Sequence, residues 1–231
     1  MTAVTTSGPT TSERERNAAR SREAILDAAE HLFAERGYDA TILSDVGQQA
    51  GLSRATPGYF FGSKADLYRA VLERSFTEAR EAVFKGRDRA LASNEPPEAI
   101  LAAVIRDYFD FLTTRPRFIR LMEREALGGG PAWDGPSPAL RAGQEALAAI
   151  VEELGLKGGR SRDAAHLLLS MVALCWFPLI HARTLLPTVG LDAESPRYAE
   201  ERKRHVIDLI LHGVSGRLHA ERPVPATESA S

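Results

Sequence analysis

The sequence predicts an all-α protein with two helical domains, and three observations support this fold class. Apolar residues recur at spacings of three and four along most of the chain, which is the pattern of helices with one buried face. Serine, proline and glycine stand where such stretches begin and end. No segment shows the strict alternation of a half-buried strand. With 231 residues, 44% of them hydrophobic, the chain has room for one small and one larger domain.

Residues 44–64, SDVGQQAGLSRATPGYFFGSK, predict two short helices joined by a tight turn. Gly51 stands where a helix needs a residue with positive φ in order to stop. Gly47, four residues earlier, leaves room for the second helix to approach closely, and Ser53 has a side chain suited to capping that helix. Two helices joined steeply by a glycine turn are typical of the helix-turn-helix unit, which places a helix in a DNA groove.

The start of the second short helix has two possible positions. If Ser53 is the N-cap, Pro57 falls at the fifth helical place and removes the first regular hydrogen bond. If Thr56 is the N-cap, Pro57 becomes the first helical residue, a position that proline favours. The sequence alone leaves both positions open.

The segments on either side of this unit predict two further helices. Residues 22–37 carry an apolar stripe and end at Gly37, so they predict a supporting first helix. Residues 63–66, Ser-Lys-Ala-Asp, resemble a capping box that opens another helix, with an apolar stripe reaching about residue 84. A three-helix unit followed directly by a long helix is therefore expected.

A run of motifs extends over residues 20–72. The first helix and the turn after it read ILDAAEHLFAERGYDAT, AGLS follows at the Gly51 turn, and TPGYFFGSK leads into the next helix. Spacing and residue type agree across three helices, so the run is specific. In these residues the chain resembles the tetracycline-repressor-like (TetR) family of transcriptional regulators.

The resemblance implies an N-terminal three-helix helix-turn-helix DNA-binding domain followed by a larger helical domain for ligand binding and dimerisation. It implies a transcriptional regulator, with repression the usual mode, that binds a palindromic operator as a homodimer. A small-molecule effector would release the protein from the operator. The partners implied are therefore double-stranded DNA, an effector of unknown identity and a second copy of the chain.

The resemblance also implies which residues contact DNA. The second short helix would lie in the major groove and present Arg54, Ala55 and Thr56. Arg54 can donate two hydrogen bonds to guanine, and the Thr56 methyl group can contact thymine. At Ile42 and Gly58 the chain departs from the family, whose members commonly carry a polar and an aromatic residue there. The other residues expected at the DNA surface are Arg22, Ser44, Ser53, Tyr59 and Lys64.

Four segments are expected along the chain. Residues 1–17 are polar and predict a disordered arm, and residues 18–64 form the DNA-binding domain. Residues 65–220 form the effector-binding and dimerisation domain, and residues 221–231 predict a disordered tail.

Aromatic and sulfur-containing side chains of the larger domain are candidates for an effector cavity, because such side chains suit flat apolar molecules. An aromatic residue at helical spacing is, however, more often part of the core. The candidate cavity residues are Tyr108, Phe111, Met122, Trp133, Trp176 and Phe177, with His166 as a polar contact.

Residues 167–180 are apolar on nearly all sides, which predicts a buried helix covered on several faces. A second subunit would supply part of this cover; alternatively, the same residues only fill the core of one subunit. The resemblance implies a four-helix bundle across a two-fold axis, which would place two recognition helices about 34 Å apart on successive major grooves. The residues expected at this interface are Leu168, Val172, Leu179, Ile207, Ile210 and Val214.

Composition bounds the remaining classes of protein. The net charge of −2 requires any polyanion to be met by a local basic surface, and the single cysteine, Cys175, excludes an internal disulfide. No signal peptide is visible, and the longest apolar stretch is shorter than a bilayer-spanning helix requires, so a cytoplasmic protein without a membrane partner is expected. No HExxH, GxSxG or Cys/His cluster is present, so no enzyme, metal or cofactor is expected. A helical scaffold and an all-α enzyme remain the alternative classes.

Overall fold

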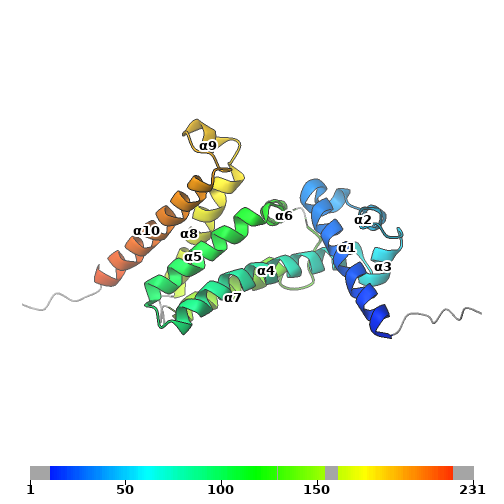
Figure 1. Cartoon of the computed structure of the whole chain (residues 1–231), viewed down its shortest axis with the longest axis horizontal. Helices are drawn as coiled ribbons and strands as arrows, with labels where there is room; N and C mark the ends of the chain where they lie inside the picture. Colours follow the sequence, from blue (N-terminus) through cyan, green and yellow to red (C-terminus); the bar gives the residue numbers. More distant parts are fainter. Residues whose placement is uncertain (1–10, 129, 154–160, 221–231) are drawn as a thin grey trace, which may run out of the picture. The chain divides into compact units, whose positions relative to one another are not determined.

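A computed structural model describes residues 11–128, 130–153 and 161–220, and over these residues the protein is all-α. The predicted fold class is therefore confirmed. Figure 1 shows the helices in chain order. The predicted tail and the first ten residues of the predicted arm lie outside the described residues.

The chain divides into two compact units. The first contains the residues up to Thr77 together with Pro116–Arg141, and the second contains Glu78–Arg115 and the chain from Ala142 onward. Helix α4 (Lys64–Ala92) contributes to both units, and α6 (Pro116–Ala126) belongs to the first. This division differs from the boundary expected at residue 64, because the first part of α4 and the whole of α6 pack with the N-terminal helices.

Helix α1 (Thr11–Ala40) begins earlier than the sequence predicts. Residues 11–17, which were expected in a disordered arm, are helical, and Arg16 Nε donates a hydrogen bond to the Ser12 carbonyl at 3.2 Å. Glutamate and arginine are strong helix formers, so this polar segment extends the helix without burying a face. At Gly37 the backbone leaves the helical region, with φ 84°, as expected for the predicted stop.

In the first unit, α2 (Leu43–Gln49) and α3 (Thr56–Phe61) lie beside α1 (Figure 1). Arg74 on α4 forms ion pairs with three carboxylates of α1: Glu23 at 3.3 Å, Asp27 at 2.6 Å and Glu30 at 2.6 Å. An apolar core and this ion-pair network together join α1 to α4. The most deeply buried side chains of this core include Ile25, Leu26, Ala29, Phe33, Val46, Leu67, Tyr68, Val71 and Leu72.

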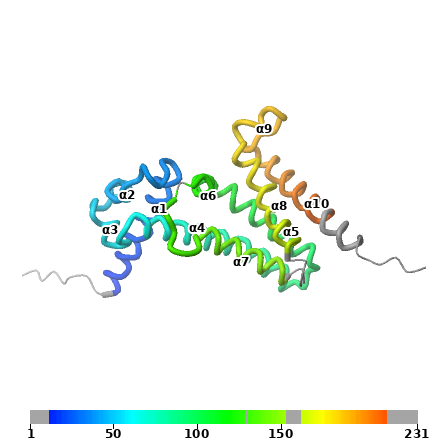
Figure 2. The backbone as a smooth tube through the Cα atoms, turned by 180° about the vertical axis from the view of Figure 1, so that it is seen from behind, coloured from blue at the N-terminus to red at the C-terminus, as the bar shows by residue number. Residues whose placement is uncertain are grey.

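The second unit is built on α5, α8 and α10, which lie side by side in Figure 2. Its apolar core includes Ile105, Phe109, Leu112, Cys175 and Val206. The helices that lie wholly in the second unit are α5 (Pro97–Thr114), α8 (Ser161–Ile180), α9 (Leu185–Thr188) and α10 (Pro196–Ala220). Helix α7 (Pro138–Glu153) starts in the first unit and continues in the second. The proline and serine start signals predicted four of these helices, whereas the four-residue α9 carries no such signal.

Helix α8 is less buried than the sequence predicts. Only 22% of the apolar window within Arg162–Ile180 is buried inside the chain, so the prediction of a buried helix is wrong for the single subunit. By length and composition this 19-residue stretch could cross a membrane, contrary to the expectation that it is too short. The core or interface helix of a non-membrane protein has the same composition, so these two properties do not indicate a membrane by themselves.

Candidate nucleic-acid interface

The turn between α2 and α3 has the predicted geometry. Gly51 has φ 70°, and its N–H donates to the Gln48 carbonyl at 3.1 Å. A Cβ added at Gly47 would lie 2.6 Å from the Ser53 carbonyl oxygen and 3.2 Å from Pro57 Cδ. No real Cβ approaches a backbone oxygen so closely, so only glycine lets the start of α3 pack on α2. The predicted roles of Gly47 and Gly51 are confirmed.

The structure also decides where α3 begins. The helix starts at Thr56, with Ala55 at the N-cap and Pro57 as the second helical residue. The predicted start with Ser53 as N-cap is therefore wrong, and the start with Thr56 as N-cap is one residue late. The Ser53 and Thr56 hydroxyl oxygens are 2.7 Å apart and share a hydrogen bond. The Tyr59 N–H donates to the Ala55 carbonyl at 3.2 Å. Pro57 therefore occupies a place where its missing N–H costs no hydrogen bond.

One side of α3 is exposed and the other is buried. Pro57 is buried against α2, whereas the Tyr59 side chain is 87% exposed. Ser53, Arg54 and Ala55 are exposed but precede Thr56, the first helical residue. The prediction that the second short helix itself presents Arg54 and Ala55 is therefore wrong, because Arg54 lies in the turn before the helix and Ala55 at its N-cap. No described residue forms an ion pair or hydrogen bond with the Arg54 guanidinium. The expectation that Arg54 faces outward is confirmed. Its contact with a base, and those of Ala55 and Thr56, stay predictions.

The start of α4 forms the predicted cap. The Asp66 N–H donates to Ser63 Oγ at 3.1 Å, and Ser63 Oγ donates to Asp66 Oδ2 at 2.6 Å. Lys64 has contacts that the sequence does not predict: its ammonium donates to the Tyr38 carbonyl at 3.0 Å and lies 4.2 Å from the Tyr38 ring centroid. Lys64 thus joins α4 to the end of α1, and its phosphate contact stays a prediction.

Two further predicted DNA contacts lie on α1 and α2. The Arg22 guanidinium lies 5.0 Å from the ring centroid of Phe61, the last residue of α3. This contact places an exposed cation of α1 next to α3. Ser44 is half-buried in the first turn of α2. Ile42, at the N-cap of α2, makes no side-chain cap and is 53% exposed. It is therefore part of the candidate surface, although it is not among the predicted DNA contacts. An apolar residue at a cap position was its signal in the sequence.

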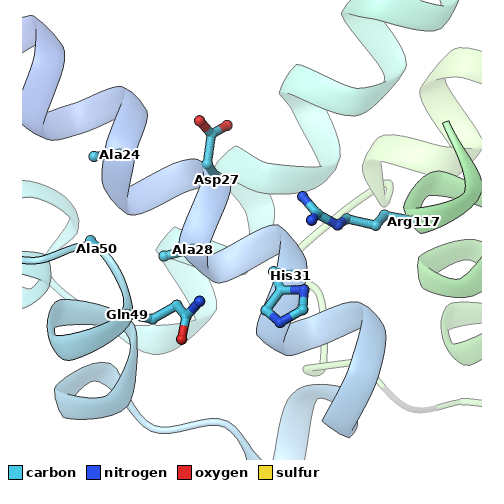
Figure 3. Close-up of a pocket in the computed structure, with 7 residues that line it drawn as sticks. All are labelled: Ala24, Asp27, Ala28, His31, Gln49, Ala50 and Arg117. Atoms are coloured by element: carbon cyan, nitrogen blue, oxygen red, sulfur yellow. The ribbon is translucent and has the colours of Figure 1, made fainter. Parts of the chain in front are cut away.

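A hollow of about 370 Å³ opens elsewhere on the first unit, between α1, α2 and the start of α6 (Figure 3). Three alanines, Ala24, Ala28 and Ala50, line it, and none of the predicted cavity residues does. The polar residues that line it are Asp27, His31, Gln49 and Arg117. The hollow is therefore distinct from the predicted effector cavity.

The candidate cavity residues fall into both units. Met122 is buried in the first unit, where Trp133 packs on α4, so Trp133 does not project freely from a flexible loop. In the second unit Trp176 Nε1 donates a hydrogen bond to the Tyr108 hydroxyl, and burial raises the pKa of that hydroxyl.

The other candidates in the second unit differ in exposure. Phe111 is buried, and His166 is exposed. Phe177 is 51% exposed, which argues against a place inside a cavity of the single chain. Within the described residues, no group of three or more His, Cys, Asp or Glu side chains could hold a metal ion.

A helix-turn-helix with an outward-facing cationic edge, carried by an all-α chain, defines a DNA-binding transcriptional regulator. Residues 25–71 match the family of bacterial regulatory proteins of the tetR type, and residues 97–210 match a tetracyclin repressor-like C-terminal domain. The chain belongs to the TetR family.

Individual relatives agree with this assignment. The chain is 28% identical to the HTH-type transcriptional repressor NicS of Pseudomonas putida over 88% of this chain and 97% of that protein. Its fold is similar to that of a TetR family regulator from Marinobacter aquaeolei, with TM-score 0.65 and 18% identity over 84% and 97% of the two chains. The fatty acid degradation regulator FadR of Bacillus halodurans has a similar fold, with TM-score 0.62 and 15% identity over 83% and 98%.

Proposed function

We propose that this regulator is a cytoplasmic repressor that binds a palindromic operator as a homodimer and leaves it when a small molecule binds. The exposed Arg54 in the turn that leads into α3 is the observation that carries the proposal. Family membership and the repressor activity in the name of NicS support it. No catalytic activity is assigned to the chain.

The proposed DNA surface consists of groups with separate tasks. Arg54 reads guanine through two hydrogen bonds, and Thr56 and Ala55 contact thymine methyl groups. Tyr59 is exposed and reaches a phosphate through its hydroxyl, and Lys64 adds a point charge. The remaining proposed contacts are Arg22, Ser44 and Ser53.

The proposed dimer surface is revised from the predicted residues. Ile210 is buried inside its own unit, Leu168, Val172, Leu179 and Ile207 are half-buried, and the side chain of Val214 lies outside the described residues. The exposed apolar positions of α8 recur at helical spacing instead, with Leu169 at 65% exposure, Phe177 at 51% and Ile180 at 38%. A second copy of the chain covers this stripe, with exposed Leu209 of α10 at its edge.

For the effector we propose a site in the second unit near Tyr108 and Trp176, which are aromatic groups with polar tips. The effector must bind the DNA-free arrangement better than the operator-bound one. A shift from almost all bound to almost all free needs about 5.5 kcal/mol of preference. A compound that binds the protein and leaves operator affinity unchanged would argue against this mechanism.

Selection of duplexes from a random-sequence DNA library by the purified full chain tests the proposal. The expected result is a palindrome whose half-sites are centred about 10 base pairs, or one helical turn, apart. Recovery of no preferred duplex would reject the operator-binding function and leave the helical scaffold as the alternative. Recovery of a single half-site would reject the dimer alone.

A further inference from the structure

Trp133, between α6 and α7, packs on the start of α4 in the first unit. The ring of Trp133 stacks on that of Tyr68, with centroids 6.1 Å apart and an interplanar angle of 15°. The Arg69 guanidinium lies 4.7 Å from the Trp133 ring centroid. Trp133 is therefore held by two consecutive residues of α4.

Glu125, near the end of α6, fixes this contact through both carboxylate oxygens. Trp133 Nε1 donates to Glu125 Oε1 at 3.0 Å, and the Tyr68 hydroxyl donates to Glu125 Oε2 at 2.9 Å. Burial and the nearby carboxylate raise the pKa of Tyr68, so its hydroxyl keeps its proton and remains a donor. One carboxylate thus satisfies both aromatic donors.

The backbone of the segment also fits closely. A Cβ added at Gly130 would collide with the Glu125 carboxylate and lie 3.3 Å from Tyr68 Cε1. Two residues of the preceding helix hold the other side of the contact: Arg124 Nε donates to the Ala34 carbonyl at 2.8 Å, and Arg120 pairs with Glu35. Gly130 and Trp133 are therefore fitted to Glu125 and Tyr68, while the two arginines of α6 join that helix to α1.

Tyr68 continues the contact to the start of α4. Its side chain is 1% exposed, and its ring meets Phe33 at 4.8 Å and Tyr38 at 5.1 Å between centroids. Tyr38 in turn holds Lys64 through its ring and its carbonyl oxygen. An unbroken series of packed side chains thus runs from Trp133 to the lysine proposed to contact phosphate.

We propose that Glu125 and Trp133 are positioning residues for DNA binding, which hold Tyr68 and Tyr38 so that Lys64 stands where a phosphate can meet it. This inference rests on the proposed DNA contact of Lys64. Packed chains of this kind carry coupling energies that a double-mutant cycle measures.

The experiment measures the affinity of the full chain for the duplex recovered from the random library. Trp133→Ala is expected to lower this affinity about 10-fold, at a temperature where circular dichroism shows the variant to be folded. Leu127→Ala is the matched control, because Leu127 lies in the same segment and is 88% exposed. Trp133→Phe keeps the stacking and loses the hydrogen bond, so it should restore most of the affinity.

Two readouts separate positioning from mere stabilisation. In the double variant Trp133→Ala/Lys64→Ala, the loss from Lys64→Ala should be smaller than in the wild-type background. In a Trp176→Phe background Trp133 is the only tryptophan, and its fluorescence emission should shift when the selected duplex is added. When Glu125→Gln is added to this background, the Trp133 ring is released and the duplex should cause no shift.

Three results would overturn the inference. They are an affinity of Trp133→Ala within about twofold of Leu127→Ala, additive losses in the double variant, or unchanged Trp133 emission on DNA binding. If Trp133→Ala does not fold, the affinities of Trp133→Phe and Glu125→Gln are compared with that of Leu127→Ala instead. Each of these two variants should lose less affinity for DNA than Trp133→Ala. A wild-type chain that selects no duplex would reject the proposed function instead.

Discussion

Helices α3 and α8 both expose large side chains, but the two surfaces differ in chemistry. Tyr59 of α3 is exposed, as are Ser53 and Arg54 in the turn before it, and all three side chains carry polar groups that are favourable in water. The exposed side of α8 is a continuous apolar stripe that includes Leu169 and Phe177, which is unfavourable in water unless a partner covers it. The comparison predicts a polyanionic partner for α3 and an apolar partner for α8.

A charge in the α8 stripe should have the largest effect. Phe177→Glu should convert a dimer into a monomer and weaken operator binding by about 100-fold or more, because the two DNA-binding heads no longer bind together. Sedimentation and gel-shift titration measure the two effects. Leu91→Glu, at another exposed leucine, is the control and should leave both unchanged. A Phe177→Glu dimer of normal strength would show that the stripe has another partner.

The presentation of α3 depends on its turn, so the next test concerns Gly47. Gly47→Val should destabilise the fold by about 1–3 kcal/mol or more, because no side chain fits against the Ser53 carbonyl. Urea unfolding measures this loss. Gly143→Ala is the matched control: nothing lies within 4 Å of an added Cβ there, so stability should stay equal or rise. Equal unfolding curves for Gly47→Val and wild type would contradict the close packing of α2 and α3.

Arg54 sharpens the comparison from the DNA side. Arg54→Ala should cost about 1–3 kcal/mol of operator affinity and relax preference at one base position, because its two hydrogen bonds are lost. The selection experiment repeated with this variant measures the preference. Arg197→Ala, which removes an exposed arginine of α10 paired with Glu201, should leave the preference unchanged. Loss of affinity without loss of preference would make Arg54 a phosphate contact.

The smallest expected effect concerns Cys175, which α8 directs to the inside of its unit. Burial raises the pKa of this thiol from 9.0 to about 12, although Arg202 opposes the shift. Thiol reagents at pH 8 should therefore modify the unfolded chain but not the folded one. The neutral thiol favours the folded state below pH 9, and this contribution is lost as the pH rises from 9 towards 12. Rapid labelling of the folded chain would place Cys175 on the exposed side of α8.

Local signals in the sequence predicted the helix-turn-helix well, and long-range contacts were harder to predict. The two glycines of the turn and the cap at Ser63 act within a few residues, so their geometry follows from residue type and spacing. The place of Trp133 depends on Glu125 and Tyr68, which lie on two other elements. No periodicity in the sequence indicates that these three residues meet.

Helix α8 shows a second limit. Its composition predicts burial on all sides, but composition does not state which residues supply the cover or whether they belong to the same chain. The dimer residues predicted on α8 are half-buried in the single chain, and the proposed stripe lies at neighbouring positions of the helix. The exposure of Leu169 and Phe177, rather than their hydrophobicity, identifies the stripe.

Arg74 restricts how the first unit can rearrange. Its partners on α1 are spaced four and three residues apart, so one guanidinium fixes two turns of that helix at the same time. A roll of α1 about its own axis would break all three ion pairs, one of them with a buried carboxylate, and expose the apolar face beneath them. Any reorientation of α1 must consequently carry the start of α4 along with it as one rigid piece.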